Sequence, residues 1–150
     1  MRTIPYPMLL IFKLEDKIRF YVAHQRTSQS DSSKNTIEEF VSTDWLGNDS
    51  ALFVKLDIKQ MRLTNIYTLY SDMVDAISIY NLSAIMPTDD TVTGAKAREL
   101  SAKIEDIEQR IANLRSKLKK ESQFNRKMEL NIEIKRLEQS KNKLLGGDNE

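Results

Sequence analysis

The chain has 150 residues, of which 40% are hydrophobic and 30% are charged, and its formal net charge at pH 7 is +1. This length and composition fit a folded domain with a sizeable core, and the near-zero net charge points to no class of partner. The chain has no cysteine, which excludes disulfides and thiol chemistry. Its apolar run at residues 8–12 is too short for a signal-peptide core or a membrane span, so we expect a cytoplasmic protein without a membrane segment.

The first part of the chain predicts a small antiparallel sheet. Met8–Leu14 is an almost continuous apolar run, which is typical of a strand buried on both faces. After a polar turn, the alternation over Ile18–Val22 predicts a second strand that forms a hairpin with the first. Gln25–Lys34 has no apolar residue and is expected to be a solvated loop. Two further strands are predicted at Thr36–Thr43 and Ala51–Leu56.

The hydrophobic period changes after residue 57. Between Ile66 and Tyr80 the apolar residues recur mainly at steps of three or four, which predicts an amphipathic helix across one face of the sheet. Residues 81–94 contain a proline, two aspartates and a glycine, and we interpret them as a linker. The sequence therefore predicts an α+β domain at residues 1–80, a linker at 81–94 and a helical hairpin at 95–146.

Two arms in the last third of the chain carry apolar residues at heptad spacing, which is typical of helices that pack along another helix. Their seam positions are Leu100, Ile104, Ile107, Ile111, Leu114, Leu118, Leu130, Ile134, Leu137 and Leu144. Lys141 occupies one further seam position, where it either sets the register or extends to solvent. About ten residues separate the arms, which favours an antiparallel coiled-coil hairpin, with one continuous helix as the alternative.

A basic cluster lies at the predicted tip of the hairpin, where Ser122 is expected to cap the second helix. The cluster consists of Arg115, Lys117, Lys119, Lys120, Arg126 and Lys127. These residues serve either to keep the helices soluble, to contact phosphates of a nucleic acid or to bind an acidic protein surface. Phe124 lies among them and is expected to cap the seam, stack on a base or fill a partner's pocket.

No catalytic, cofactor or metal site is evident in the sequence. The four glycines form no phosphate-binding loop, and His24, the single histidine, cannot build a zinc site or a histidine-dependent triad without cysteine or further histidines. Glu15–Lys17 has the E-x-K spacing of metal-dependent nucleases, but no acidic residue precedes it, which favours a polar turn. We therefore predict that the chain is not an enzyme, with a nuclease as the weakest alternative.

Three segments carry a resemblance to a known family: Ile4–Leu10, Thr43–Leu46 and, most specifically, Gln123–Asn131. Together they resemble a bacterial family of domains of unknown function, numbered 4391, over nearly the whole chain. Members typically occur beside genes for DNA methyltransferases and helicases of restriction–modification type, and the resemblance implies no catalytic residues. Members usually have several tens of residues ahead of the first segment, so we expect this sheet to lack an N-terminal element and to expose an edge that favours self-association.

The resemblance implies an accessory role in a restriction–modification or phage-defence assembly. With the heptad seam, it favours a non-enzymatic interaction subunit that docks through its hairpin onto a methyltransferase or helicase of the same locus. A nucleic-acid-binding module is the alternative, and a homo-oligomer is also open. The candidate interaction residues are Gln123, Phe124, Asn125, Arg126, Lys127, Asn131, Arg115, Lys119 and Lys120.

Overall fold

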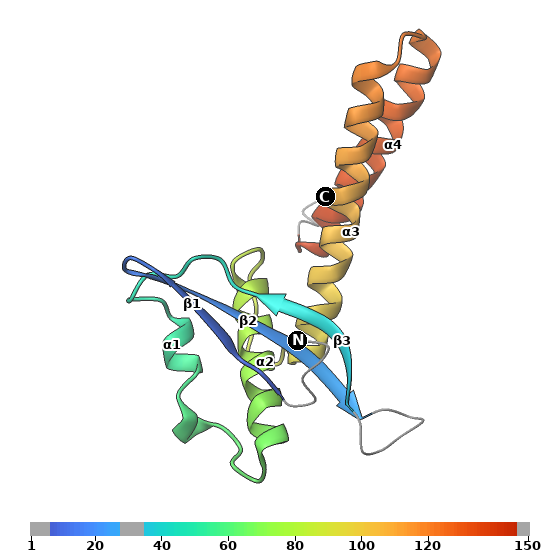
Figure 1. Cartoon of the computed structure of the whole chain (residues 1–150). Helices are drawn as coiled ribbons and strands as arrows, with labels where there is room; N and C mark the ends of the chain where they lie inside the picture. Colours follow the sequence, from blue (N-terminus) through green and yellow to red (C-terminus); the bar gives the residue numbers. More distant parts are fainter. Residues whose placement is uncertain (1–6, 28–34, 147–150) are drawn as a thin grey trace. The chain divides into compact units, whose positions relative to one another are not determined.

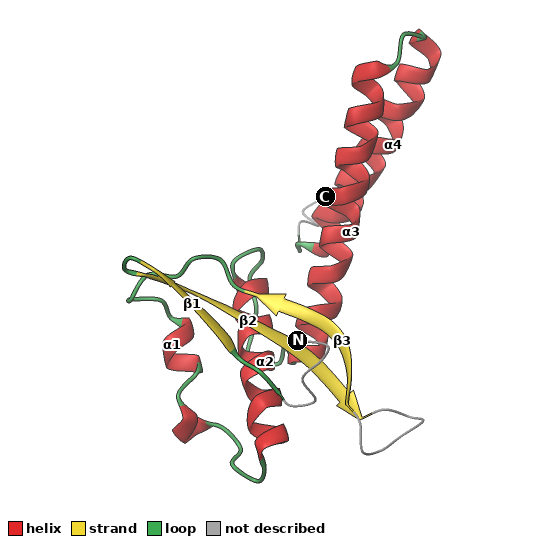
Figure 2. Cartoon of the chain, in the orientation of Figure 1, coloured by secondary structure: helices red, strands yellow, loops and turns green. Residues whose placement is uncertain are grey.

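The computed structural model describes residues 7–27 and 35–146, and within them the architecture is α+β (Figures 1 and 2). The elements are β1 (Leu10–Leu14), β2 (Lys17–Thr27), β3 (Asn35–Ser42), α1 (Leu52–Lys55), a 3-10 turn (Ile58–Gln60), α2 (Ile66–Ser83), α3 (Gly94–Lys120) and α4 (Phe124–Leu144). The chain divides into two compact units, residues 1–81 and 82–150. In the described ranges no helix has both the length and the apolar character needed to cross a bilayer.

The sheet has β2 at its centre, paired antiparallel with β1 on one side and with β3 on the other. This confirms the predicted small antiparallel sheet. The tight turn between β1 and β2 places Glu15 at a φ of 53°, a left-handed conformation that non-glycine residues rarely adopt. β2 continues to Thr27, so the start of the predicted loop at Gln25 is strand instead, because backbone pairing requires no apolar side chain. The rest of that predicted loop, residues 28–34, lies outside the described residues, as do the first three residues of the Ile4–Leu10 segment.

The prediction that Met8–Leu14 is buried on both faces is wrong. β1 is an edge strand, and Ile11, Phe12 and Leu14 are all exposed. The Phe12 ring instead packs edge-on against the Tyr21 ring, with 5.3 Å between the ring centroids. An apolar run predicts an extended strand, but its burial depends on whether other elements cover both faces.

The predicted strand at Ala51–Leu56 is wrong, because this segment forms the short helix α1. Leu52 is fully buried, and Phe53 and Leu56 pack against the same core. Val54, which a strand would bury together with Leu52, is 68% exposed. The described sheet therefore has three strands, and the chain after β3 continues it only by a single bridge, in which Ile18 and Leu46 exchange two backbone hydrogen bonds of 2.9 and 2.8 Å.

The core of the first unit lies between one face of the sheet and the helices α1 and α2. Its buried members are Phe20, Val22, Val41, Leu46, Leu52, Tyr70, Val74 and Ile77. Phe20 and Val22 are two residues apart on β2 and so lie on the same face of the sheet. Tyr70, Val74 and Ile77 recur at helical spacing on α2, and their side chains pack into the same core. This confirms the predicted helix across the sheet, which begins after Asn65, whose side chain accepts a hydrogen bond of 2.8 Å from the Thr68 N–H.

The second unit is built mainly from α3 and α4. α2 ends at Ser83, three residues into the predicted linker, and α3 begins at Gly94 after the N-cap Thr93, whose hydroxyl accepts from the Lys96 N–H at 3.2 Å. α3 and α4 are separate helices, with residues 121–123 between them. α4 runs back along α3, as Figure 1 shows.

Candidate functional site

The turn between α3 and α4 is organised by the carboxylate of Glu121. It accepts hydrogen bonds from the backbone N–H groups of Gln123 and Ser122, at 2.9 and 2.8 Å. These two bonds lower the pKa of Glu121. The predicted capping role of Ser122 is wrong, because Gln123 is the N-cap residue of α4 and makes no side-chain cap bond. The carboxylate of Glu121, the C-cap residue of α3, therefore binds the backbone of the turn just before α4.

Seam residues of both helices meet in one apolar cluster. Its buried members are Ile111 and Leu114 of α3 with Ile134 and Leu137 of α4. The partly buried residues Ile107, Leu118 and Leu130 pack against this cluster. Of the other predicted seam positions, Ile104 is buried, whereas Leu100 and Leu144 are partly buried.

Two ion pairs across the helices flank the cluster. Arg115 of α3 and Glu138 of α4 are 2.8 Å apart, and Lys141 of α4 pairs with Glu108 of α3. The Lys141 side chain is only 28% exposed, so its stem lies along the seam while its ammonium group meets a carboxylate at the edge. Glu108 precedes Arg115 along α3, whereas its partner Lys141 follows Glu138, the partner of Arg115, along α4. This reversed order is that of two antiparallel helices.

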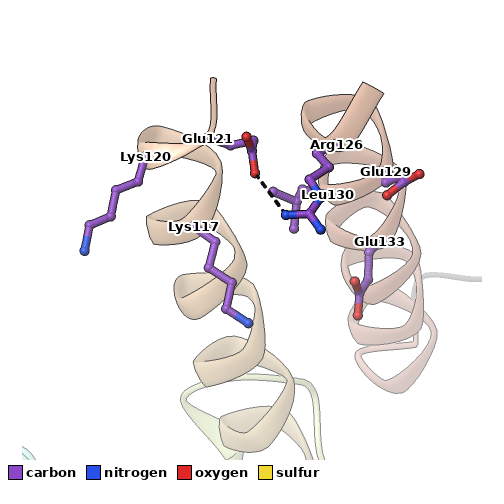
Figure 3. A pocket seen from close by; sticks show the side chains of 7 residues that line it. All are labelled: Lys117, Lys120, Glu121, Arg126, Glu129, Leu130 and Glu133. Atoms are coloured by element: carbon purple, nitrogen blue, oxygen red, sulfur yellow. Dashed lines mark ion pairs between the residues drawn. The ribbon is translucent and has the colours of Figure 1, made fainter. Parts of the chain in front are cut away.

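A shallow cavity of about 420 Å³ opens at the tip. Its lining residues, drawn in Figure 3, are Lys117, Lys120, Glu121, Arg126, Glu129, Leu130 and Glu133. Arg126 lies 4.0 Å from Glu121 across this space. Three carboxylates therefore share the cavity with three cations, so this part of the tip is of mixed charge rather than uniformly basic.

The residues expected to form an interaction site are all exposed, although only some of them line the cavity. The exposed positions are Gln123, Phe124, Asn125, Arg126, Lys127, Asn131, Arg115, Lys119 and Lys120. Arg126 belongs to the cavity, and Arg115 is engaged with Glu138 on the side of the helices. Phe124, the first residue of α4, is 74% exposed and therefore does not cap the seam.

Sequence reasoning missed two exposed apolar residues of α4, Met128 and Ile132. They fall outside the heptad seam, so the search for seam positions passed over them. Their spacing from Phe124, four and eight residues, is the signal that could have found them, because residues four apart are neighbours on a helix surface.

The weaker chemical candidates lie at the β1–β2 turn and on β2. Glu15 and Asp16 form the β1–β2 turn, and Lys17 begins β2. His24 lies on β2 opposite Glu39 of β3. Within residues 7–27 and 35–146, no three His, Cys, Asp or Glu side chains gather closely enough to hold a metal ion.

Comparison with known proteins places the chain in a family. The model of a domain of unknown function, DUF4391, matches residues 1–140. The chain belongs to the DUF4391 family. No curated protein and no solved structure matched the chain. The DUF4391 match extends over the whole tip, from the end of α3 through Phe124 and Ile132.

Proposed function

We propose that this chain is a non-enzymatic interaction subunit of a bacterial restriction–modification or phage-defence assembly, and that it docks through the tip of an antiparallel coiled-coil hairpin formed by α3 and α4. The exposure of Phe124 at the first residue of α4 supports this proposal most directly. Aromatic and arginine side chains dominate the binding energy of many protein interfaces, and Phe124 lies two residues from Arg126. The tip thus offers an apolar anchor and a cation on opposite sides of α4, because residues two apart on a helix differ by about 200° around its axis.

The packing beneath the tip suits a rigid presentation of this anchor. The apolar cluster of Leu114 and Leu137 joins the two helices, and the Arg115–Glu138 pair bridges them on the surface. A preorganised surface loses less conformational entropy on binding than a flexible one. Docking would therefore leave the hairpin itself unchanged.

A nucleic-acid-binding module is the second candidate function, and the exposed Lys119, Lys120 and Lys127 favour it. Against it, Glu129 and Glu133 line the same cavity as Arg126. A phosphate backbone entering this cavity would meet three carboxylates, those of Glu121, Glu129 and Glu133, whereas a protein surface can match a mixed pattern of charges. The protein partner is therefore the preferred proposal.

Affinity purification of the tagged chain from its native host, with nuclease treatment, tests the proposal. A methyltransferase or helicase should stay bound after nuclease, and Phe124→Ala with Arg126→Ala should lower its recovery at least tenfold. The matched control is Gln109→Ala with Arg110→Ala, which changes two exposed α3 residues and should retain the partner.

Two results would contradict the proposal. Loss of every partner on nuclease treatment would show that nucleic acid was the bridge. Binding to duplex DNA would then fall steeply with salt and would be abolished by Arg126→Glu with Lys127→Glu. Metal-dependent cleavage of DNA or RNA by the pure protein would contradict the non-enzymatic role, and Glu15→Ala with Lys17→Ala would locate that activity.

A further inference from the structure

The outer face of α4 carries a ridge of exposed apolar side chains. Phe124, Met128 and Ile132 follow one another at intervals of four residues, and they are 74%, 50% and 49% exposed. Residues four apart are neighbours on a helix surface, so the three form one ridge along about two helical turns. Single exposed apolar residues are ordinary on protein surfaces, whereas contiguous ones are typical of interaction sites.

The apolar ridge lies on the side of α4 opposite to the seam. Leu130, which packs against the α3–α4 cluster, is two residues away from both Met128 and Ile132. Two residues correspond to a rotation of about 200° around the helix axis. The seam thus leaves the ridge uncovered, and the packing of α3 against α4 does not explain it.

Basic and neutral polar residues surround the apolar ridge. Lys135 and Arg136 follow Ile132 by three and four residues, which places them beside it on the helix surface, and both are exposed. Asn125 and Asn131 flank the ridge and are also exposed. This face of α4 is therefore apolar along its centre and positively charged at one end.

Of the acidic residues of α4, Glu129 precedes Ile132 by three residues and so flanks the ridge, whereas Glu133 and Glu138 do not lie three or four residues from a ridge residue. Glu129 and Glu133 line the tip cavity together with Lys117 of α3, as Figure 3 shows. Glu138 is paired with Arg115. Lys127, three residues after Phe124, joins Lys135 and Arg136 beside the ridge, so this face carries three exposed cations against the one flanking carboxylate of Glu129.

We propose that the apolar ridge docks an acidic amphipathic helix of a partner protein, an inference that rests on the proposed function and names its partner's chemistry. A row of side chains at intervals of four residues is the ridge that fits a groove of a second helix. Acidic residues beside the partner's apolar stripe would complement Lys135 and Arg136.

Two other occupants fit the ridge less well. Only Phe124 among the three ridge residues has an aromatic ring, so Met128 and Ile132 provide none for the base stacking that single-stranded nucleic acids use. A second copy of the chain that docked in parallel through the same face would bring Lys135 and Arg136 close to their own counterparts, and like charges oppose that arrangement.

Two synthetic amphipathic helices of 21 residues provide the probe, with leucine at the heptad a and d positions and either glutamate or lysine at the remaining charged positions. Fluorescence anisotropy with the full-length chain should show at least tenfold tighter binding of the glutamate peptide at low salt. Met128→Gln with Ile132→Gln should weaken that binding at least tenfold. Ala112→Gln with Ser116→Gln, an exposed α3 pair at the same spacing, should leave it unchanged.

Circular dichroism of both variants should show unchanged helix content, because glutamine is a good helix former. Equal binding of the two peptides, or of neither, would overturn the proposal. Binding of an oligonucleotide that is lost in the variant with Met128→Gln and Ile132→Gln would assign the ridge to nucleic acid. Self-association that is lost in the same variant would assign the ridge to a second copy of the chain. If host partners still depend on Phe124 and Arg126 while the peptides fail, the proposed function stands and the acidic-helix inference falls.

Discussion

Among single residues, Tyr70 connects separate segments of the first unit. Its hydroxyl accepts a hydrogen bond of 2.8 Å from the Ala23 N–H, and it lies 3.0 Å from the carbonyl oxygens of Met8 and Ala23, which share its single donated proton. Burial raises the pKa of Tyr70 above the ordinary 10.0. One side chain of α2 thus satisfies backbone groups of the central strand and of the chain before β1.

Tyr70→Phe should lower the free energy of unfolding at pH 7 by about 1–3 kcal/mol, because the buried Ala23 N–H loses its partner. Urea denaturation measures the change, and Tyr21→Phe, which keeps its ring contacts, should stay within about 0.5 kcal/mol. The raised pKa means that the hydroxyl's contribution is complete below pH 10 and is lost as the pH rises through the folded-state pKa. The difference in the free energy of unfolding between Tyr70→Phe and the wild type should therefore become smaller in strong alkali. A difference that becomes larger there would contradict this role of the hydroxyl.

Two exposed apolar residues of α4, Met128 and Ile132, were not predicted from the sequence pattern. The heptad pattern predicted Leu114, Ile134 and Leu137 as seam positions, and these side chains lie in one apolar cluster. The same pattern gave no reason to inspect Met128 and Ile132, which lie off the seam. The spacing of residues along a helix shows which of them share a face. It does not show whether the opposite face of that helix also carries apolar residues without a partner in the fold.

Among the elements, α2 is tied to the chain that precedes it by Asp72. Its carboxylate accepts hydrogen bonds from the Arg62 N–H at 2.8 Å and from the Arg62 guanidinium at 2.5–3.2 Å. These bonds, led by those of the guanidinium, lower the pKa of Asp72 below 3.8. The segment between the 3-10 turn and α2 is thereby fastened to the helix it leads into.

Asp72→Asn should lower the melting temperature at pH 7 by a few degrees, because an amide cannot replace the charged acceptor. Since the folded-state pKa lies below the ordinary 3.8, the carboxylate's contribution is present above that pH and is lost as the pH falls through the folded-state pKa. Melting curves at pH 7 and pH 2.5 should therefore show a difference from the wild type that shrinks in acid. Asp90→Asn, an exposed position, serves as the control, and a difference that is independent of pH would count against the role of Asp72.

The elements differ in how well their patterns predicted them. α2 was predictable because Tyr70, Val74 and Ile77 repeat at helical spacing over many residues. α1 was not, because Leu52 and Val54 alternate over a segment too short to distinguish a strand from one turn of helix. Its state was decided by the surrounding core, which receives Leu52, Phe53 and Leu56.

At the scale of the whole molecule, the buried apolar side chains of the described residues form two cores. Ile77, which is fully buried, belongs to the core of sheet and helices, and Leu137 belongs to the α3–α4 cluster. The two compact units, residues 1–81 and 82–150, contain one core each. Each core can therefore be perturbed by itself.

Ile77→Ala and Leu137→Ala should each cost about 2–5 kcal/mol within their own core. Native-state hydrogen exchange should show faster exchange of β2 and α2 amides in the first variant and of the central α3 and α4 amides in the second. Met128→Ala removes an exposed side chain and should change exchange little. Equal loss of protection in both units by either variant would show that the two cores unfold as one.

The sequence by itself determined that a sheet precedes the long helices and that apolar residues recur at heptad spacing over residues 100–144, and it contains no cysteine and one histidine. These follow from period and composition, which depend only on the order of residues along the chain. The tertiary structure decided that Phe12 and Val54 stay exposed, that Glu121 rather than Ser122 organises the tip, and that Phe124 stands clear of the seam. Burial depends on which element covers a face, and that is settled by contacts between residues far apart in the sequence.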